Sequence, residues 1–489
     1  MRKLHLILIA ITSLLLLASV LFGGIQLYAA QNTVPSGTIV GGLELGGQSI
    51  EEAERLLDEE LQTLGGGSVQ FSLQLTEKKT YSYTWSELGV SWTAPEFRTA
   101  LLSLSSGSLW DRTIARKNFL KHWSLSINFN PSKLKNVFSP AWESKQFGDP
   151  VNATRTIDPD DRIHYLPGHA VQRIRWAAFI ALIREAAPDQ FMLDDEHSYS
   201  SESRIIKIPL ILQQPAATIE GLKKEGITRK IAEYSTNLSG SAAGRIHNVD
   251  AAARSIDGMI LPPDGIFDYA SIVEAAETNY GFREAPVILS GKLVPGVGGG
   301  ICQVSSTLYN AAIRAGLKIV ERKNHSLPVS YVPKGQDATF ATGYINFRFQ
   351  NTSKAHLLIT AQVEGGQLTI KLFGDSPENT SYDIESITTD VLPVQNKYVA
   401  NPSLPSGSQE IILEGKPGYI VETYQIKKVN GKVSQRLRLS RDTYPAQPTV
   451  IAVHGSSQDN SSPDSPKNPS PQKIILEDGV AGPTFGALE

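Results

Sequence analysis

The longest apolar stretch of the chain lies at its N-terminus, where Arg2 and Lys3 precede an apolar run that ends at about Tyr28. About 20 apolar residues are enough for a helix to cross a bilayer. A cut near the end of this run would place Leu27 or Tyr28 where signal-peptide cleavage needs a small residue. Residues 1–30 are therefore predicted to be a transmembrane anchor, although cleavage stays open. Since basic residues remain on the cytoplasmic side, a single-pass cell-membrane protein with the bulk of its chain extracytoplasmic is expected.

Two small α+β modules are predicted behind this segment, at residues 33–125 and 126–215. In the first module, Ser49 and Glu52 have the spacing of a capping box, and apolar residues at helical spacing follow them. The second module contains the helix pattern AVQRIRWAAFIALIREAA, which is followed by an extended apolar segment. A weak similarity in the order of elements indicates that the two modules are related.

The remainder of the chain predicts three further parts. Residues 218–375 form a mixed α+β domain. Residues 376–455 contain short alternating segments, two of which flank Asn430–Gly431, a strong hairpin signal, so a small all-β domain is predicted. The segment SSQDNSSPDSPKNPSPQ has no periodic apolar face, and residues 456–489 are predicted to be a disordered tail. The expected fold class is a multidomain α+β protein.

Composition narrows the possible classes of function. The chain of 489 residues has 46 basic and 49 acidic residues, and without a basic stripe it is not expected to bind nucleic acid. A single cysteine excludes an internal disulfide and a cysteine-based zinc cluster. The nine histidines show neither HExxH nor HxH spacing, so no metal and no other cofactor is predicted.

The single cysteine, Cys302, follows three glycines at the start of a predicted helix. Apolar residues from Ile301 onward recur at helical spacing, and Gly316 is expected to end the helix. Cys302 would share one face with Ser306 and Tyr309, and this polar face is expected to line a substrate cleft. The unpaired N–H groups and the dipole of a helix's first turn favour a thiolate, so a lowered thiol pKa is expected.

The glycines before Cys302 admit more than one interpretation. The segment GVGGGICQVSS lacks the last glycine of GxGxxG and the lysine of a phosphate-binding loop, so neither nucleotide motif is present. Gly299 and Gly300 would leave the backbone open to a substrate carbonyl, and nearby N–H groups could hold an oxyanion. Alternatively, the glycines form a tight turn and Cys302 is a buried, inert residue.

A thiolate nucleophile needs a base, and His325, which lies 23 residues after Cys302, is the candidate. The helix, its turn and a following strand leave room for the chain to return to the thiol. Asp337 could orient the imidazole, and Arg322 could bind a substrate carboxylate through two hydrogen bonds.

Three other histidines compete with His325 for this role. His247 is placed at the N-terminal edge of a helix that begins near Val249, where a structural role is expected. His164 and His169 lie in a predicted loop of the second module, and a surface position is expected for both.

Three segments resemble one known family, and the central motif around Cys302 is the long and specific one. VPGVGGGICQVSSTLYNAAIRAGL, IVERKNHSLPVSYVPKGQDATF and FRFQNTS are similar to the VanW-domain family of Gram-positive cell-envelope proteins, and the resemblance covers about residues 230–375. The two N-terminal modules resemble the domain assigned to peptidoglycan binding that commonly precedes it. The all-β segment is more loosely similar to small glycine-marked modules at the ends of wall proteins.

The resemblance implies an anchored protein that acts on peptidoglycan stem peptides. Some family members are understood as L,D-transpeptidases that use the motif cysteine, which is Cys302 in this chain, and His325 matches the motif histidine. Such an enzyme transfers an acyl group from a tetrapeptide stem through a thioester and forms 3–3 cross-links. The alternative is a non-catalytic wall-binding or assembly protein with a structural Cys302, linked or not to glycopeptide resistance.

The chain departs from the family pattern at two places. ILPPDGIFDY has Pro263 and Asp268 where members more often have Gly and Ser, and GYINFRFQN has Asn346 where an acidic residue is common. These departures put the surrounding binding surface in question without touching Cys302 or His325.

Overall fold

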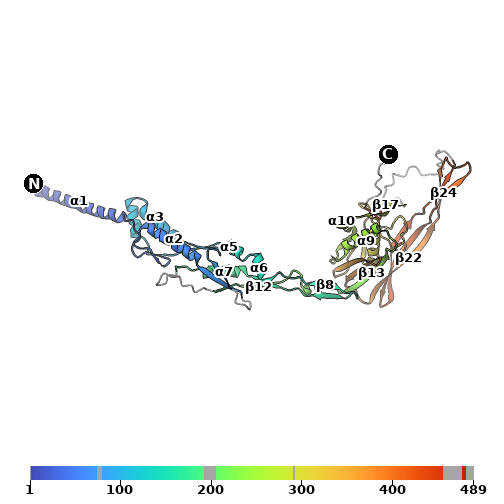
Figure 1. Ribbon diagram of the computed structural model, residues 1–489, viewed down its shortest axis with the longest axis horizontal. Helices are drawn as coiled ribbons and strands as arrows, with labels where there is room; N and C mark the ends of the chain where they lie inside the picture. The colour runs from blue at the N-terminus through green and yellow to red at the C-terminus, as the bar shows by residue number, and fades with distance from the viewer. Residues whose placement is uncertain (1, 74–79, 192–204, 290–291, 455–475, 481–489) are drawn as a thin grey trace. The chain divides into compact units, whose positions relative to one another are not determined.

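The computed structural model describes residues 2–73, 80–191, 205–289, 292–454 and 476–480 (Figure 1). The chain divides into two compact units, the first comprising residues 1–152 and 169–216 and the second comprising residues 153–168 and 217–489. Each unit is built around its own large hydrophobic core. The predicted multidomain α+β class is confirmed.

The first unit combines short helices with small sheets. Its helices are α1 (Arg2–Ala29), α2 (Ile50–Gly66), α3 (Pro95–Ser105), α4 (Leu109–Lys117), α5 (Pro131–Val137), α6 (Pro140–Phe147) and α7 (Trp176–Ala186). Its strands are β1 (Ile39–Val40), β2 (Leu43–Glu44), β3 (Ser68–Ser72), β4 (Thr80–Thr84), β5 (Val90–Thr93), β6 (His122–Trp123), β7 (Ser126–Phe129), β10 (Val171–Ile174), β11 (Ile205–Lys207) and β12 (Leu210–Gln213).

One hydrophobic core serves this whole unit, whereas the sequence pattern predicts separate modules at 33–125 and 126–215. Phe71, Phe138 and Phe179 pack edge to face with ring centroids 5.3 to 5.6 Å apart. Strand β11 also pairs in parallel with β3. Because elements of each predicted module cover apolar surface of the other, most of the two modules forms a single compact unit, whereas residues 153–168 belong to the second unit.

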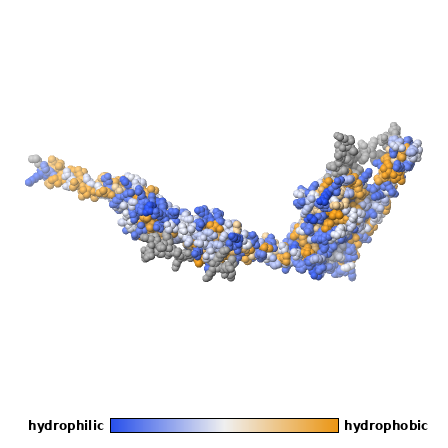
Figure 2. Space-filling model, viewed as in Figure 1, coloured by the Kyte–Doolittle hydropathy of each residue, from blue (hydrophilic) through white to orange (hydrophobic). Residues whose placement is uncertain are grey.

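The two N-terminal helices agree with their sequence patterns. Helix α1 exposes its apolar side chains along almost its whole length, as its orange surface in Figure 2 shows, and it is long and apolar enough to cross a membrane. Helix α2 is capped by Ser49, whose hydroxyl accepts a hydrogen bond from the N–H of Glu52 at 3.2 Å.

The second unit contains the remaining elements. Its helices are α8 (Ile219–Lys224), α9 (Ala243–Ile256), α10 (Tyr269–Tyr280) and α11 (Ile301–Arg314). Its strands are β8 (Thr154–Ile157), β9 (Ile163–Leu166), β13 (Arg229–Asn237), β14 (Met259–Leu261), β15 (Ile266–Asp268), β16 (Glu284–Leu289), β17 (Lys292–Val297), β18 (Lys318–Glu321), β19 (Arg348–Gln350), β20 (Leu357–Glu364), β21 (Gln367–Gly374), β22 (Thr380–Leu392), β23 (Asn396–Ala400), β24 (Gln409–Leu413), β25 (Gly418–Val429), β26 (Lys432–Tyr444), β27 (Thr449–Val453) and β28 (Leu476–Glu477).

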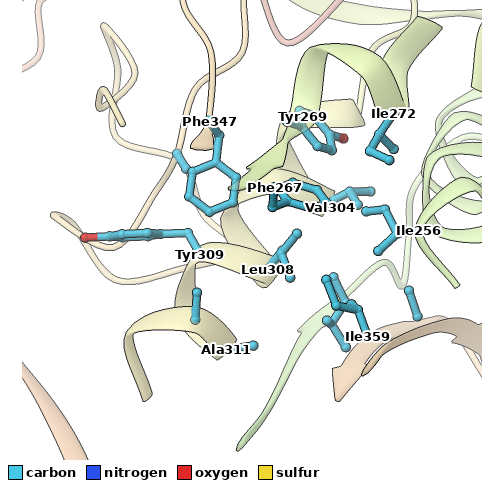
Figure 3. Packing of buried hydrophobic residues seen from close by; sticks show 14 of the residues in the cluster. Ile256, Phe267, Tyr269, Ile272, Val304, Leu308, Tyr309, Ala311, Phe347 and Ile359 are labelled. Carbon is cyan, nitrogen blue, oxygen red and sulfur yellow. The ribbon is translucent and has the colours of Figure 1, made fainter. Parts of the chain in front are cut away.

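Helix α11 lies at the centre of the second unit, and every residue from Ile301 to Ile313 is buried. One face packs on the antiparallel sheet β13-β21-β20-β14. Figure 3 shows Val304 and Leu308 of this helix among Phe267 and other apolar side chains of the core. A helix buried on all sides must find partners for its polar groups inside the protein, and this requirement shapes the candidate site.

The strand-rich part predicted at 376–455 is confirmed as all-β. Strands β22, β25 and β26 form one sheet, and β23, β27 and β24 form another. Asn430 and Gly431 have φ values of 50° and 74° and make the predicted two-residue hairpin between β25 and β26. This part packs against α11: β22 contacts the helix, and the Gln425 side chain donates a hydrogen bond to the Ile313 carbonyl at 2.6 Å.

Part of the predicted disordered tail is ordered. Leu476 and Glu477 form strand β28, which pairs with β16, and the three residues after it are described as well. The disorder prediction relied on the Ser- and Pro-rich start of residues 456–489, whereas these five residues include an apolar position that can extend a sheet. The rest of the predicted tail lies outside the described residues.

Candidate functional site

A left-handed glycine precedes helix α11. Gly300 has a φ of 108° and Gly298 a φ of 89°, values that residues with a Cβ rarely adopt. A Cβ on Gly299 would lie 2.4 Å from the carbonyl oxygen of Pro286 in β16. The glycines therefore allow the turn to lie directly against the β16–β17 hairpin. The open approach expected at Gly299 and Gly300 is not present, because the backbone of β16 lies against Gly299 and the side chains of Arg245 and Val249 lie against Gly300.

Cys302 is fully buried, and its sulfur contacts the backbone of Phe340. The Phe340 N–H donates to Sγ at 3.1 Å, and Sγ donates to the Phe340 carbonyl oxygen at 3.4 Å. Burial raises the pKa of the Cys302 thiol well above its ordinary value, and the nearby Asp478 carboxylate raises it further. The expected lowering of the thiol pKa is therefore wrong for this conformation.

Two N–H groups at the N-terminal end of α11 hold a carboxylate. Those of Gly300 and Cys302 donate to Asp478 Oδ1 at 3.1 and 2.8 Å, and Arg245 Nη1 lies 3.2 Å from Asp478 Oδ2. Two N–H groups converging on one negative oxygen have the geometry of an oxyanion site. The sequence pattern indicated an anion here but not Arg245 or Asp478. Asp478 lies 176 residues after Cys302, within the predicted tail, so no local signal points to it.

The polar face of α11 meets the protein's own segment 336–340. Ser306 Oγ accepts a hydrogen bond from the N–H of Ala338 at 2.9 Å, and Ser305 Oγ donates to the Ala338 carbonyl at 2.6 Å. Asn310 donates to the carbonyl of Gln336 at 2.7 Å. Ser306 thus positions backbone, and the prediction that its face lines a substrate cleft is wrong for this structure.

Tyr309 is likewise part of the interior and not of a substrate cleft. Its ring packs edge-on against Phe347 with centroids 5.9 Å apart, and Figure 3 shows the two side by side. Arg322 Cζ lies 5.2 Å from the centroid of the Tyr309 ring. Tyr309 therefore packs against the guanidinium of Arg322. This guanidinium contacts the segment from His325 to Asp337, called here the histidine loop.

His325 and Asp337 form the predicted pair. Asp337 Oδ2 lies 2.7 Å from His325 Nδ1 and accepts the backbone N–H of His325 at the same distance. Burial alone would raise the pKa of Asp337, but the hydrogen bond and charge of His325, with the Arg322 guanidinium, lower it to about 2. Burial would lower the pKa of His325, but Asp337 outweighs it and the pKa is raised. The carboxylate therefore favours a charged imidazole.

Arg322 was expected to bind a substrate carboxylate, but its guanidinium is engaged by groups of the protein itself. Its Nη1 lies 2.6 and 2.7 Å from the two carboxylate oxygens of Asp442, and its Nε donates to the Asp337 carbonyl at 2.6 Å. Nη2 completes the set with Gly335 and the Asp337 carboxylate. Arg322 consequently ties the histidine loop to strand β26.

The thiol and the imidazole form hydrogen bonds with opposite ends of one short segment, residues 337–340. Cys302 contacts Phe340, and His325 contacts Asp337, three residues earlier. Within the part of the chain that the structure describes, His325 Nε2 is buried and has no hydrogen-bond partner. The imidazole thus keeps one nitrogen unengaged, while the other is fixed by the carboxylate.

The competing histidines have structural or surface positions. His247 lies inside α9, which begins at Ala243, and its Nε2 lies 3.0 Å from the Gly281 carbonyl oxygen. His164 and His169 are exposed, as expected. Among the described residues, no group of three or more His, Cys, Asp or Glu side chains is placed to hold a metal ion.

Two of the residues that depart from the family pattern, Asp268 and Asn346, contact each other. Asn346 Nδ2 donates to Asp268 Oδ1 at 2.7 Å, and both side chains accept the N–H of Ala270 at the start of α10. This contact lies at the N-terminus of α10 and includes neither Cys302 nor His325.

These features define a class of protein: an α+β domain with one cysteine at a helix N-terminus, an Asp-paired histidine, and an attached all-β domain. A family model described as VanW like protein matches residues 244–373, and one described as G5 domain matches residues 384–453. The chain belongs to the VanW-like family, and together the two matches indicate a protein associated with the cell wall.

Individual relatives agree with this assignment. Over 238 residues the chain is 34% identical to the uncharacterized protein YoaR of Bacillus subtilis (strain 168). The aligned region covers 49% of this chain and 73% of that protein. Over 145 residues it is 26% identical to the vancomycin B-type resistance protein VanW of Enterococcus faecalis (strain ATCC 700802 / V583), covering 29% of this chain and 53% of that protein.

Two solved structures are also similar over a short part of the chain. The IgA1 protease G5 domain is 30% identical and covers 17% of this chain and 94% of its own, with a TM-score of 0.14. HP0197-G5 is 27% identical and covers 15% of this chain and 96% of its own, with a TM-score of 0.12.

Proposed function

We propose that this is a membrane-anchored, extracytoplasmic protein that acts on peptidoglycan stem peptides by cysteine acyl transfer of the L,D-transpeptidase type. One observation carries the proposal: the N–H groups of Gly300 and Cys302 both donate to a single carboxylate oxygen, Asp478 Oδ1. One of these N–H groups belongs to the residue that bears the thiol. The same N–H pair could hold the oxyanion that forms when a thiolate adds to a carbonyl. The apolar helix α1 would provide the anchor.

The proposed reaction has two steps. Cys302 Sγ attacks the carbonyl carbon of the third residue of a tetrapeptide stem, the bond to the nitrogen of D-Ala breaks, and the thiol proton passes to that leaving amine. An acceptor amine of a neighbouring stem then attacks the thioester, forms the 3–3 amide and returns a proton to sulfur. His325, oriented by Asp337, would carry the proton in both steps.

The reaction requires a conformation that differs from the one described. Asp478 Oδ1 accepts the hydrogen bonds of both N–H groups, and burial keeps the Cys302 thiol protonated by raising its pKa. A substrate oxyanion and Asp478 cannot occupy the same donors, so Asp478 must leave before acylation. The imidazole must also reach the sulfur, which hydrogen-bonds to Phe340 here.

The test compares wild-type protein with Cys302→Ala and Cys302→Ser on a disaccharide-tetrapeptide. We expect release of D-Ala and cross-linked product to fall to background in both variants, with an acyl adduct on Cys302 detected by mass spectrometry in the wild type only. D-Ala release by Cys302→Ala at the wild-type rate would rule out the proposal. Circular dichroism spectra that match the wild type would establish that the variants fold.

A second function, a non-catalytic wall-binding or assembly role, is favoured by the complete burial of Cys302. A cysteine whose sulfur bonds to backbone and whose thiol pKa is raised has the properties of a structural residue. In this case Cys302→Ala would lose stability while binding of purified peptidoglycan stayed at the wild-type level. A sedimentation assay with insoluble peptidoglycan measures that binding directly.

A further inference from the structure

The described residues Leu476–Val480, called here the internal segment, are held at the site like a bound peptide. Strand β28 adds to the β16–β17 hairpin, with Glu477 opposite Ile288 in antiparallel register. The N–H of Val480 donates to the Val297 carbonyl at 2.9 Å. Backbone hydrogen bonds of this kind are how extended peptides add to the edge of a sheet.

Both carboxylates of the internal segment are buried and find prepared partners. Asp478 binds at the N-terminus of α11 beside Cys302, as described above. Glu477 Oε2 accepts the N–H and the hydroxyl of Ser326 at 2.9 and 3.1 Å, directly after His325 in sequence. Glu477 and Asp478 are 9% and 5% exposed. Since a buried carboxylate is stable only where donors surround it, the site is built for two negative charges.

The positive charge of the site is fixed by residues outside the internal segment. Arg245 Nη2 donates to Gln303 Oε1 at 3.1 Å, and Gln303 in turn donates to Thr236 Oγ1 at 3.1 Å and to the Asn237 carbonyl at 3.0 Å. Gln303 directly follows Cys302 on α11. The guanidinium is thus held beside the N–H pair by the protein itself, which is the arrangement expected of a binding site for an anionic ligand.

The site also selects for a small residue after the acid. A Cβ on Gly479 would lie 2.4 Å from Val287 Cγ1 and 2.9 Å from the Val297 carbonyl oxygen. A Cβ on Gly298 would lie 3.1 Å from the nitrogen of Val480. Glycines on both sides of the contact therefore let the internal segment lie close to the hairpin.

We propose that this site binds an extended acidic peptide strand, and that the chain's own segment Leu476–Val480 occupies it and excludes other ligands. The proposal rests on the proposed function only in naming the excluded ligand as an acyl-donor peptide. The internal segment is part of the same chain, so it competes at a high effective concentration. The N–H groups of Gly300 and Cys302 are then available only after it has left.

The first experiment measures access to Cys302 in the full chain. In the double variant Glu477→Gln/Asp478→Asn both side chains keep their shape but lose their charge, and we expect alkylation of Cys302 by iodoacetamide at neutral pH to become about 10-fold faster or more. Asp390→Asn, which changes an exposed carboxylate on β22, should label at the wild-type rate. Equal rates for the folded double variant and the wild type would overturn the proposal.

The second experiment supplies the ligand separately. The peptide IILEDGV, residues 474–480, should slow alkylation of the double variant back toward the wild-type rate, whereas IILQNGV should not. Hydrogen–deuterium exchange on the wild-type chain provides a test without substitution, since the N–H of Val480 should be protected by Val297. Exchange of this amide at the rate of an unstructured peptide would also overturn the proposal.

The assay for D-Ala release separates the two proposals. Faster labelling of the double variant without D-Ala release would support the internal segment as occupant and count against acyl transfer. Unchanged labelling together with D-Ala release that depends on Cys302 would overturn the occupant and support acyl transfer.

Discussion

Asp337 links more groups of the site than its role as an orienter of His325 requires. Its carboxylate contacts the imidazole, the guanidinium of Arg322 and the hydroxyl of Tyr444. With a pKa lowered from 3.8 to about 2, Asp337 contributes stability that is fully present above pH 4 and is lost as the pH falls through about 2. His325 has a raised pKa, so its contribution is present below 6.5 and is lost as the pH rises through its folded-state pKa.

Asp337→Asn should destabilise the second unit because it removes the carboxylate paired with the buried imidazole of His325 and one of the two carboxylates that contact Arg322. We expect a loss of about 3–5 kcal/mol in the free energy of unfolding, measured by urea denaturation at pH 6. The matched control is Asp383→Asn, which removes an exposed ion pair with Lys428 and should cost about 1 kcal/mol or less. NMR titration should also show a lower pKa for His325 in Asp337→Asn. Equal losses in the two variants would contradict the role given to Asp337.

At this scale, the sequence predicted the pair but not its surroundings. His325 and Asp337 are 12 residues apart, and a motif can bring such neighbours to attention. The true partner of Arg322 is Asp442, 120 residues away, and that of the Cys302 N–H is Asp478. Pairings over such distances are set by the tertiary fold, and no local pattern of charges reveals them.

The turn before α11 is the element whose shape the site depends on most. Gly299→Ala would place a methyl group 2.4 Å from the Pro286 carbonyl oxygen and 2.8 Å from that of Ala285, so backbone must move. We expect a loss of about 1–3 kcal/mol or more in the free energy of unfolding of the second unit. Displacement of β16 should also weaken the pairing with β28, which hydrogen exchange at residues 476–480 would report.

Gly221→Ala is the control for this substitution. A Cβ there would make only an ordinary contact, 3.4 Å from the hydroxyl oxygen of Thr218, inside helix α8. Because alanine has a higher helix propensity than glycine, the variant should be unchanged or up to about 1 kcal/mol more stable. If both alanines were tolerated equally, the turn would not depend on close packing against β16.

Element boundaries were predictable where side chains mark them. The start of α11 follows its glycines as expected, and Ser49 begins α2. Helix α9 starts at Ala243, six residues before the predicted position, because its N-cap Ala242 makes no side-chain hydrogen bond that a pattern could show. The burial of the polar face of α11 was not predictable, since segment 336–340, which covers it, has no regular secondary structure.

On the scale of the whole molecule, the all-β part completes the candidate site of the VanW-like part. Tyr444 and Asp442 from β26 contact Asp337 and Arg322, and Thr423 from β25 donates to the Gly335 carbonyl at 3.0 Å. The sequence pattern treats residues 218–375 and 376–455 as separate domains, but these contacts join them in one compact unit. A substitution in the all-β part should therefore change the contacts of Asp337 and Arg322 that hold His325.

Asp442→Asn tests this coupling. The Arg322 side chain is 5% exposed, and without the Asp442 charge Asp337 would be its remaining ionic partner. The contact between Arg322 and Asp337, and with it the pairing of Asp337 with His325, should then change. We expect the thermal transition of the second unit to move down by the equivalent of about 3–5 kcal/mol, while the transition of the first unit, which has its own core, stays in place. Asp390→Asn, in the same all-β part but in an exposed pair with Arg441, should leave both transitions within about 1 kcal/mol of the wild type.

A His325 titration that is identical in Asp442→Asn and the wild type would show that the all-β part does not support the site. A shift confined to Asp442→Asn would make residues 376–455 part of the chemistry proposed for Cys302.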